Sequence, residues 1–340
     1  MRTSMWMNAC PRPMFAAMAA TWILAACGGG GGSGGDASFK VALSVDGVAD
    51  ASNPMSVGET TTITAPSGAT LTFESNGDAV WTLAATSSDY DVRTDSARSK
   101  SIVVTSNGGG GLSLVFANAA IPSQTLTLNV VVEPKHFERV AMTEGEVADW
   151  ANTVVLLSGG TLDSPYRRRS ALIGSDGHYR QDSAVAWNPD EFTYRYLFDA
   201  DDRQTGYQDL TSAHACTYSS PLADVTYPLY VGKTWSVTAQ KTCNDTPDVR
   251  GTATVSVVEA FEPVTVGAGT HDTLRIRTET TYSGLPDSDV PGGTFTESET
   301  CWWAVDLGRQ VKCEATMHYP AGTQDPKIVS QSRSLVAFGH

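Results

Sequence analysis

The chain has six histidines, and their spacing does not suit a metal or catalytic site. No two of them have the H-x-x-x-H or HExxH spacing that brings two imidazoles to one metal ion. His271 and Asp272 are adjacent, but neighbouring residues of a strand point to opposite faces and cannot share a proton. No serine lies in a motif that would activate it as a nucleophile. The sequence therefore favours a protein without enzymatic activity, cofactor or metal.

Three carboxylates stand close together at the end of a predicted strand. Asp199, Asp201 and Asp202 occur in the segment FDADDRQTG, and clustered carboxylates can bind Ca²⁺. Arg203 occupies the fifth position of the calcium-loop pattern, where its charge opposes a dication, and no glutamate closes the loop. We expect a solvated turn.

Four cysteines in the second half of the chain predict two disulfides. Cys216, Cys243, Cys301 and Cys313 include no C-x-x-C pair, and no histidine lies at zinc-ligand distance from a cysteine pair. Disulfides are therefore favoured over metal ligation in an exported chain. Four cysteines allow three pairings.

The segment CWWAVDLGRQVKC, residues 301–313, selects one of these pairings. Asp306-Leu307-Gly308 fits a three-residue hairpin loop with Gly308 in the left-handed conformation. Counting outward from this loop places Cys301 opposite Cys313, within disulfide reach after small strand adjustments. A two-residue loop at Leu307-Gly308 would instead oppose Cys301 to Glu314. We predict Cys301–Cys313, which leaves Cys216–Cys243 as the second bond.

The same register separates two adjacent tryptophans. It pairs Trp303 with Val311 on the apolar face and places Trp302 on the other face, opposite Lys312. Trp302 is then either covered by a second layer or exposed as an aromatic contact. We predict an outward indole over the Lys312 stem and name both residues as a candidate partner contact.

The amino-terminal segment resembles a bacterial lipoprotein signal. Arg2 and Arg12 precede an apolar run, residues 14–24, that is too short to span a bilayer. The run leads into the lipobox-like sequence LAAC. The resemblance implies that residues 1–26 are removed and that Cys27 is acylated, which anchors the chain in a membrane. Residues 27–35 form a glycine-rich tether. Because Gly28 rather than aspartate follows the cysteine, the resemblance favours the outer membrane of the cell envelope.

The chain is acidic, with a formal net charge of −14. An acidic surface repels the phosphate backbone, so we do not expect nucleic acid as a partner. Arg167-Arg168-Arg169 is the only basic cluster, and we interpret it as a solvated sheet edge.

Short alternating strands predict an all-β protein with two regions. Residues 36–133 fit an immunoglobulin-like β-sandwich with Trp81 as its central anchor. Within them, residues 56–132 resemble bacterial immunoglobulin-like domains of the BACON type, many of which act as spacers.

Residues 138–340 fit a large antiparallel sheet, curled into a half barrel and stapled by the two disulfides. A helix is expected over residues 144–151, although NTVVLLSGG also fits a buried strand. The segments YPLYVGKTW, EPVTVGAGTHDTLRI and CWWAVDLGRQVK resemble uncharacterised β-rich periplasmic proteins and lipoproteins of bacteria. No activity comes with that resemblance.

These observations predict an envelope lipoprotein that acts as a binding or structural module for a protein or glycan. The alternative is a carrier of an apolar ligand in the half barrel; a hydrolytic enzyme is disfavoured. The carrier requires a cavity above ~300 Å³. The carrier is favoured if an open cavity is lined by the aromatic side chains Phe192, Tyr194, Tyr196, Trp235 and Trp303. It is disfavoured if these side chains close a packed core.

Overall fold

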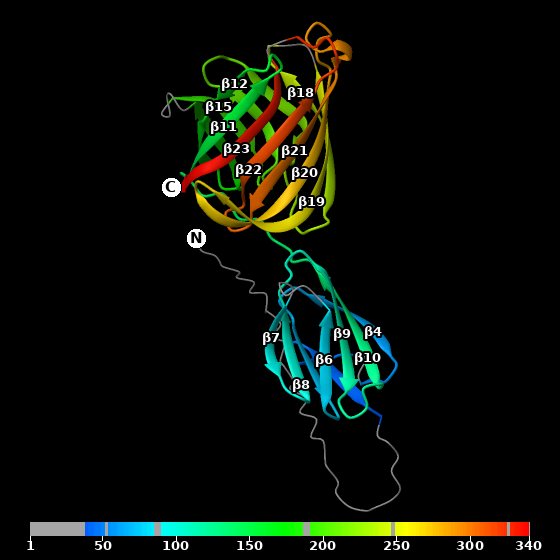
Figure 1. Cartoon of the computed structure of the whole chain (residues 1–340). Coiled ribbons are helices and arrows are strands. Elements are labelled where there is room, and N and C mark those ends of the chain that lie inside the picture. Colours follow the sequence, from blue (N-terminus) through cyan, green and yellow to red (C-terminus); the bar gives the residue numbers. More distant parts are fainter. Residues whose placement is uncertain are drawn as a thin grey trace, which may run out of the picture. The chain divides into compact units, whose positions relative to one another are not determined.

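The computed structural model describes residues 38–51, 54–84, 90–185, 191–245, 249–324 and 327–339. The predicted signal peptide, the tether and Cys27 lie outside these ranges. The described chain is almost entirely β structure, which confirms the all-β class (Figure 1). Its one helical turn within those ranges is the 3-10 segment η1, Pro291–Gly293. No helix in the described part has the length and apolar character needed to span a bilayer.

The amino-terminal strands form two facing sheets, in which all neighbours are antiparallel except β4 and β10. One sheet has the order β2-β1-β5-β8-β7, with β3 beside β1, and the other has the order β4-β10-β9-β6. The strands are β1 Lys40–Val45, β2 Val48–Ala49, β3 Met55–Ser56, β4 Thr60–Pro66, β5 Thr70–Ser75, β6 Ala79–Ala84, β7 Tyr90–Asp95, β8 Ser99–Val104, β9 Gly110–Asn118 and β10 Thr125–Glu133.

Two phenylalanines, rather than Trp81, form the centre of this sandwich. Phe73 and Phe116 are fully buried with ring centroids 5.2 Å apart, while Trp81 is half-buried and meets Phe116 edge-on at 5.0 Å. The Trp81 indole N–H donates to the carbonyl of Ser96 at 2.9 Å. The expectation of a central Trp81 is therefore corrected: its polar ring edge requires a partner at the margin of the core.

The remaining strands form one thirteen-stranded sheet that closes on itself. They are β11 Val147–Leu156, β12 Thr161–Asp163, β13 Tyr166–Ile173, β14 His178–Val185, β15 Phe192–Phe198, β16 Gln204–Asp209, β17 Ala215–Leu222, β18 Thr234–Cys243, β19 Arg250–Val266, β20 Gly269–Ser283, β21 Phe295–Ala304, β22 Arg309–His318 and β23 Ile328–Gly339.

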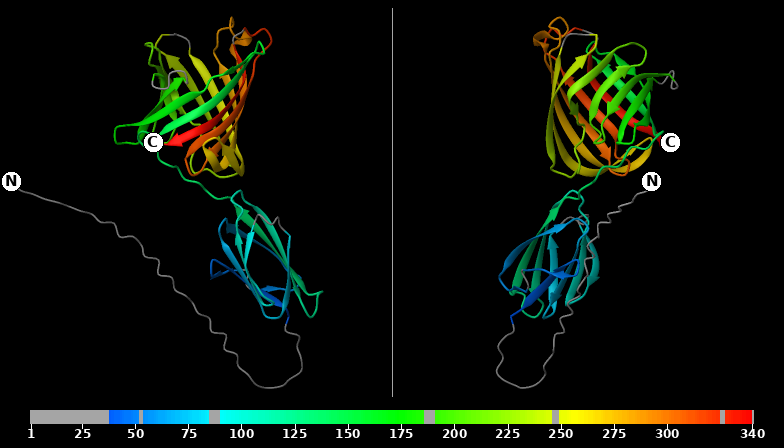
Figure 2. Two further views of the ribbon diagram at one scale, coloured as in Figure 1. Left: turned by 60° about the vertical axis from the view of Figure 1, so that its left-hand side comes forward. Right: turned by 180° about the vertical axis from the view of Figure 1, so that it is seen from behind.

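Closure comes from the pairing of β11 with β23, which lie side by side in the wall of the barrel (Figure 1 and Figure 2). Trp150 pairs with Leu335 in this register. The sheet is therefore a complete barrel and not the half barrel that we expected. Closure leaves the sheet without two exposed strand edges. The alternating pattern within single strands does not indicate whether a sheet closes.

The helix expected over residues 144–151 is wrong, because β11 occupies most of that segment. Its buried side chains are Trp150, Asn152 and Val154, spaced by two as in a strand. The residues that suggest a helix cap instead form a turn, in which Gly145 has a positive φ of 82°.

An apolar layer fills one part of the barrel interior. It contains Val258, Leu274, Ile276 and Trp303, together with residues from two covering segments. These segments precede β11 and β18, and they meet at an isolated bridge between Phe137 and Leu229. Elsewhere in the interior, polar side chains are among those that line an open space.

The hairpin of β21 and β22 has the predicted disulfide register but a different turn. Cys301 pairs with Cys313 and Trp302 with Lys312, as predicted. A β-bulge then pairs Trp303 with Gln310, so the predicted pairing with Val311 is wrong. Gly308 has the expected left-handed φ of 63°.

Candidate functional site

The barrel encloses a cavity of about 530 Å³. Its lining residues come from β13 and from β15 to β23, so the cavity lies in the lumen of the closed sheet. The volume lies within the usual range of small-molecule sites. We call this space the lumen cavity.

Strand alternation explains how the lumen cavity acquires polar walls. Thr252 and Thr254 on β19 and Thr278 and Thr280 on β20 point inward, while the residues between them point outward. Small hydroxyl side chains at these positions leave the space that larger apolar residues fill in the apolar layer.

One wall of the lumen cavity carries several carboxylates close to a single arginine. Arg333 donates to Glu299 at 2.7 Å, and Asp224 also lines the cavity. Burial raises the pKa of the Glu299 and Asp224 carboxyls, and the charge of Arg333 partly opposes this rise. Glu297 accepts a hydrogen bond from the Tyr282 hydroxyl at 2.6 Å.

Another wall carries cations without a carboxylate partner among the described residues. Lys241 and Arg250 lie opposite each other in the register of β18 and β19, and both line the cavity. Burial lowers the pKa of Lys241, and Arg250 lowers it further. Two like charges side by side favour an anionic ligand that can neutralise them.

Arg168 also projects into the lumen cavity. Its guanidinium lies 5.2 Å from the ring centres of both Tyr166 and Tyr196, and its buried Nε has no hydrogen-bond partner. The interpretation of residues 167–169 as a solvated edge is therefore wrong, because β13 is an interior strand with neighbours on both sides. Arg167 pairs with Asp149 on the opposite face at 2.7 Å.

Aromatic side chains form the remaining wall, but not the set that the sequence suggested. Tyr196 and Trp303 line the cavity as expected. Trp235 belongs to the apolar layer, and Phe192 lies under Arg169 at 4.4 Å. A β-bulge between Ser183 and Ala184 turns Phe192 away from the face of Tyr196.

The further aromatic residues of the wall are Phe198, Tyr218, Tyr282 and Phe295. Burial raises the pKa of the Tyr218 hydroxyl to about 12, so it stays protonated and can donate a hydrogen bond.

The carboxylate turn at Asp199 is only partly solvated. Asp202 is buried and forms a bidentate pair with Arg139 at 2.7 and 2.9 Å. Asp199 is also buried and accepts from Arg203, which leaves Asp201 as the exposed member. The expected solvated turn is thus corrected, since Arg139, far away in sequence, supplies the counter-charge.

Both predicted disulfides are present, Cys301–Cys313 and Cys216–Cys243. In the described part of the chain, two groups of side chains place potential metal ligands within 4.8 Å of one another: His214 with Cys216 and Cys243, and Glu299 with Cys301 and Cys313. The expectation that no histidine lies near a cysteine pair is therefore wrong, because the hairpin that carries Cys216 and Cys243 brings His214 beside them. In the disulfide form neither group offers a thiolate, so neither is a metal site in this state.

Trp302 lies on the outer face of the barrel, as the register predicts. Its indole N–H donates to Glu262 at 2.7 Å, and Lys312 lies 4.5 Å from the ring centre. Lys312 also pairs with Glu314 at 2.8 Å. Contacts within the chain already occupy both the edge and one face of the ring, and the partner contact at this position stays a prediction.

The lumen residues Asp224, Lys241, Arg250, Glu299 and Arg333 were not identified from the sequence. A signal for two of them exists in the strand pattern. Lys241 shares a face with Trp235 and Cys243, and Glu299 shares a face with Cys301. A charge at an inward position of an otherwise apolar strand indicates a hydrated interior.

No protein-family model matches this chain, and no curated protein matches it. Five solved chains resemble it, among them two bacterial proteins. One is a Bacteroides fragilis NCTC 9343 protein named for a YmcC-like fold, with 10% identity and a TM-score of 0.39, covering 61% of this chain and all of the other. The second is the hypothetical lipoprotein YmcC from Escherichia coli K12, with 9% identity and a TM-score of 0.31, covering 55% and 86%. Both scores lie below 0.5, so no function is inferred from these likenesses.

Proposed function

We propose that this chain is a lipid-anchored protein of the bacterial envelope that binds a small amphipathic anion in its lumen cavity. The observation that carries the proposal is the cavity of about 530 Å³ with aromatic and cationic walls. Anchoring through Cys27 rests on the lipobox resemblance of residues 24–27. A protein or glycan partner on the outer surface is retained as a prediction.

The wall chemistry supports an amphipathic ligand over a purely apolar one. Aromatic faces such as Tyr196 and Phe295 can cover an apolar body, while Lys241 and Arg250 can bind a carboxylate, sulfonate or phosphate. A purely apolar guest would leave these two cations desolvated without a counter-charge, which is costly. The acidic wall is already neutralised in part by Arg333.

A direct test uses the lipidated full chain in lipid nanodiscs. Native mass spectrometry should detect a retained small molecule, and the anionic aromatic probe 1-anilinonaphthalene-8-sulfonate should bind the emptied protein. Replacing Lys241→Ala or Arg250→Ala should raise the Kd of the probe about tenfold, because each removes a charge-assisted contact.

The matched control is Arg277→Ala. Arg277 lies on the outward face of β20, half exposed and paired with Glu259, so its removal should leave the Kd unchanged. Equal affinities for the wild type and both lumen variants would contradict anion binding in the cavity.

A further inference from the structure

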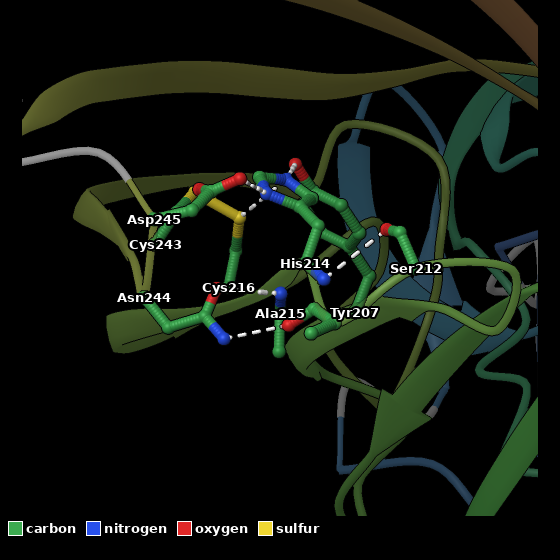
Figure 3. The surroundings of a disulfide bond; sticks show 9 residues. Tyr207, Ser212, His214, Ala215, Cys216, Cys243, Asn244 and Asp245 are labelled. Atoms are coloured by element: carbon green, nitrogen blue, oxygen red, sulfur yellow. Dashed lines mark hydrogen bonds and ion pairs between the residues drawn. A yellow bond between two sulfur atoms is a disulfide. The ribbon is translucent and has the colours of Figure 1, made fainter.

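The disulfide between Cys216 and Cys243 lies against a hydrogen-bonded imidazole (Figure 3). His214 Nε2 is 3.3 Å from Cys216 Sγ, and His214 Nδ1 is 2.7 Å from the carboxylate of Asp245. The Tyr207 hydroxyl lies 3.2 Å from the same Nε2. The carboxylate fixes Nδ1 as the protonated nitrogen, so Nε2 faces the sulfur.

Local hydrogen bonds hold this arrangement in place. Asn244 donates to the carbonyl of Ala213 at 2.6 Å and accepts from the amide of Ala215 at 3.0 Å, on both sides of His214. The amide of His214 donates to the Ser212 hydroxyl at 3.2 Å. The imidazole is therefore held beside the disulfide by both strands that the disulfide joins.

The two cysteine residues differ in exposure. Cys216 is 2% exposed, whereas Cys243 is only half-buried. His214 and Asp245 are also accessible, with 27% and 55% of their side chains exposed. Lys241 lies two residues before Cys243 on the same face and adds positive charge near the pair. An attacking thiolate would therefore reach Cys243 first.

We propose that Cys216–Cys243 is a thiol-exchange site that accepts electrons from a dithiol reductant. A thiolate of the reductant forms a bond to Cys243 Sγ, the Cys216–Cys243 bond breaks, and its electron pair remains on Cys216 Sγ. The proton lost by the first reductant thiol passes to His214 Nε2, which donates it toward this thiolate, while the Asp245 carboxylate accepts from Nδ1.

The second thiol of the reductant completes the exchange. It loses its proton and attacks the reductant sulfur of the mixed disulfide, which releases Cys243 as a thiolate. The reductant leaves as its own disulfide, and its two protons are balanced by those taken up at Cys216 and Cys243. Two electrons pass to the protein.

Cys301–Cys313 serves as an internal comparison in the same chain. Both of its cysteines are buried, with exposures of 6% and 1%, and Cys301 lines the lumen cavity. No histidine contacts either sulfur in the described residues. Arg333 lies 4.0 Å from Cys301 Sγ, but its charge is already paired with Glu299 at 2.7 Å. Its exchange should therefore be slow.

The experiment treats the folded full chain with dithiothreitol and traps thiols at intervals for mass spectrometry. Cys216–Cys243 should be reduced at least about tenfold faster than Cys301–Cys313. Replacing His214→Gln should slow reduction of Cys216–Cys243 about tenfold, because a neighbouring cation lowers the pKa of the leaving thiol and speeds its departure.

The control is His178→Gln, which removes an imidazole paired with Asp176 at 3.4 Å on a different hairpin. It should leave both rates unchanged. Thiolate absorbance near 240 nm in the reduced protein gives an independent readout, and its midpoint should move at least one pH unit upward in His214→Gln. Asp245→Asn should move it in the same direction without removing the ring.

Two results would overturn the proposal. One is a His214→Gln rate within twofold of the wild type together with an unmoved absorbance midpoint. The other is equal reduction of both disulfides in the wild type.

Discussion

Arg333 is the residue on which the charge balance of the lumen depends. It is the ion-pair partner of Glu299, and both side chains are half-buried, while Asp224 is an exposed residue that lines the same cavity. Removing one member of such a group leaves the others desolvated and uncompensated, which costs more than the pair contributes when intact. Arg333 therefore supplies the counter-charge that lets the barrel fold around carboxylates in its interior.

Replacing Arg333→Met should lower the free energy of unfolding by about 2 kcal/mol at pH 7, below the value for a dry interior because the cavity admits water. Urea denaturation followed by circular dichroism measures this difference. Arg277→Met, which removes a half-exposed outer ion pair, should cost under about 1 kcal/mol. A loss in Arg333→Met no larger than in Arg277→Met would contradict a structural role for the lumen arginine.

The same variant should change how stability depends on pH. The pKa values of Glu299 and Asp224 are raised in the folded protein. At a pH between their unfolded and folded pKa values, the folded state therefore binds more protons than the unfolded state. Stability must then fall as pH rises through that interval. Arg333→Met removes the attraction that opposes the rise, so its deficit relative to wild type should grow as pH rises above the ordinary pKa of these carboxyls. Unfolding curves at each pH would show this, and a constant deficit would refute it.

At the scale of elements, local patterns predicted more than long-range ones. The Cys301–Cys313 pairing was predicted correctly, although the turn differs: Ala304 rather than Val305 pairs with Arg309, and the bulge beside Trp303 restores the predicted register at the cysteines. Gly308 has the left-handed conformation that was expected. The bulge beside Trp303 was not predicted, because Val311 and Cys313 keep the two-residue spacing of a regular strand and no local signal marks the extra residue. The helix expected over residues 144–151 failed because Glu146 is held by Arg309, 163 positions along the chain.

Gly308 also limits how closely the covering segment can approach the hairpin. A Cβ at this position would lie 2.6 Å from Cβ of Val140, in addition to the strain of a positive φ. Gly308→Ala should therefore lower the free energy of unfolding by about 3 kcal/mol. Gly159→Ala is the matched control: its φ is 87° but no atom lies within 4 Å of the added Cβ, and the cost should be about 1 kcal/mol. If both variants lost the same free energy of unfolding, in thermal or urea denaturation, Val140 would have moved aside without cost and the prediction would be wrong.

At the scale of the whole molecule, the sequence predicted the class of fold but not its closure or its interior. Alternation along β18 and β20 predicts which side chains share a face, and the structure places them so. Which face encloses a cavity depends on the pairing of β11 with β23, and no local pattern encodes that pairing.

The attachment of the whole molecule to a membrane depends on Cys27 in our proposal. Cys27→Ser should abolish incorporation of labelled fatty acid and shift the protein from the detergent phase to the aqueous phase, because the thiol is the acylated group. Cys10→Ser, in the same predicted leader, should leave lipid labelling intact. Labelled Cys27→Ser protein would contradict the lipobox interpretation.

The pairing of β11 with β23 also has a consequence for how the chain acquires its structure in time. Val147 of β11 pairs with Gly339 of β23, so the ring cannot be joined until nearly two hundred further residues have been made. Contacts of such sequence separation form slowly. Until then β11 presents an unpaired edge, and Glu299 has no guanidinium beside it, because Arg333 arrives on the closing strand. We expect an incomplete chain that lacks β23 to expose the edge of β11 and to be prone to association.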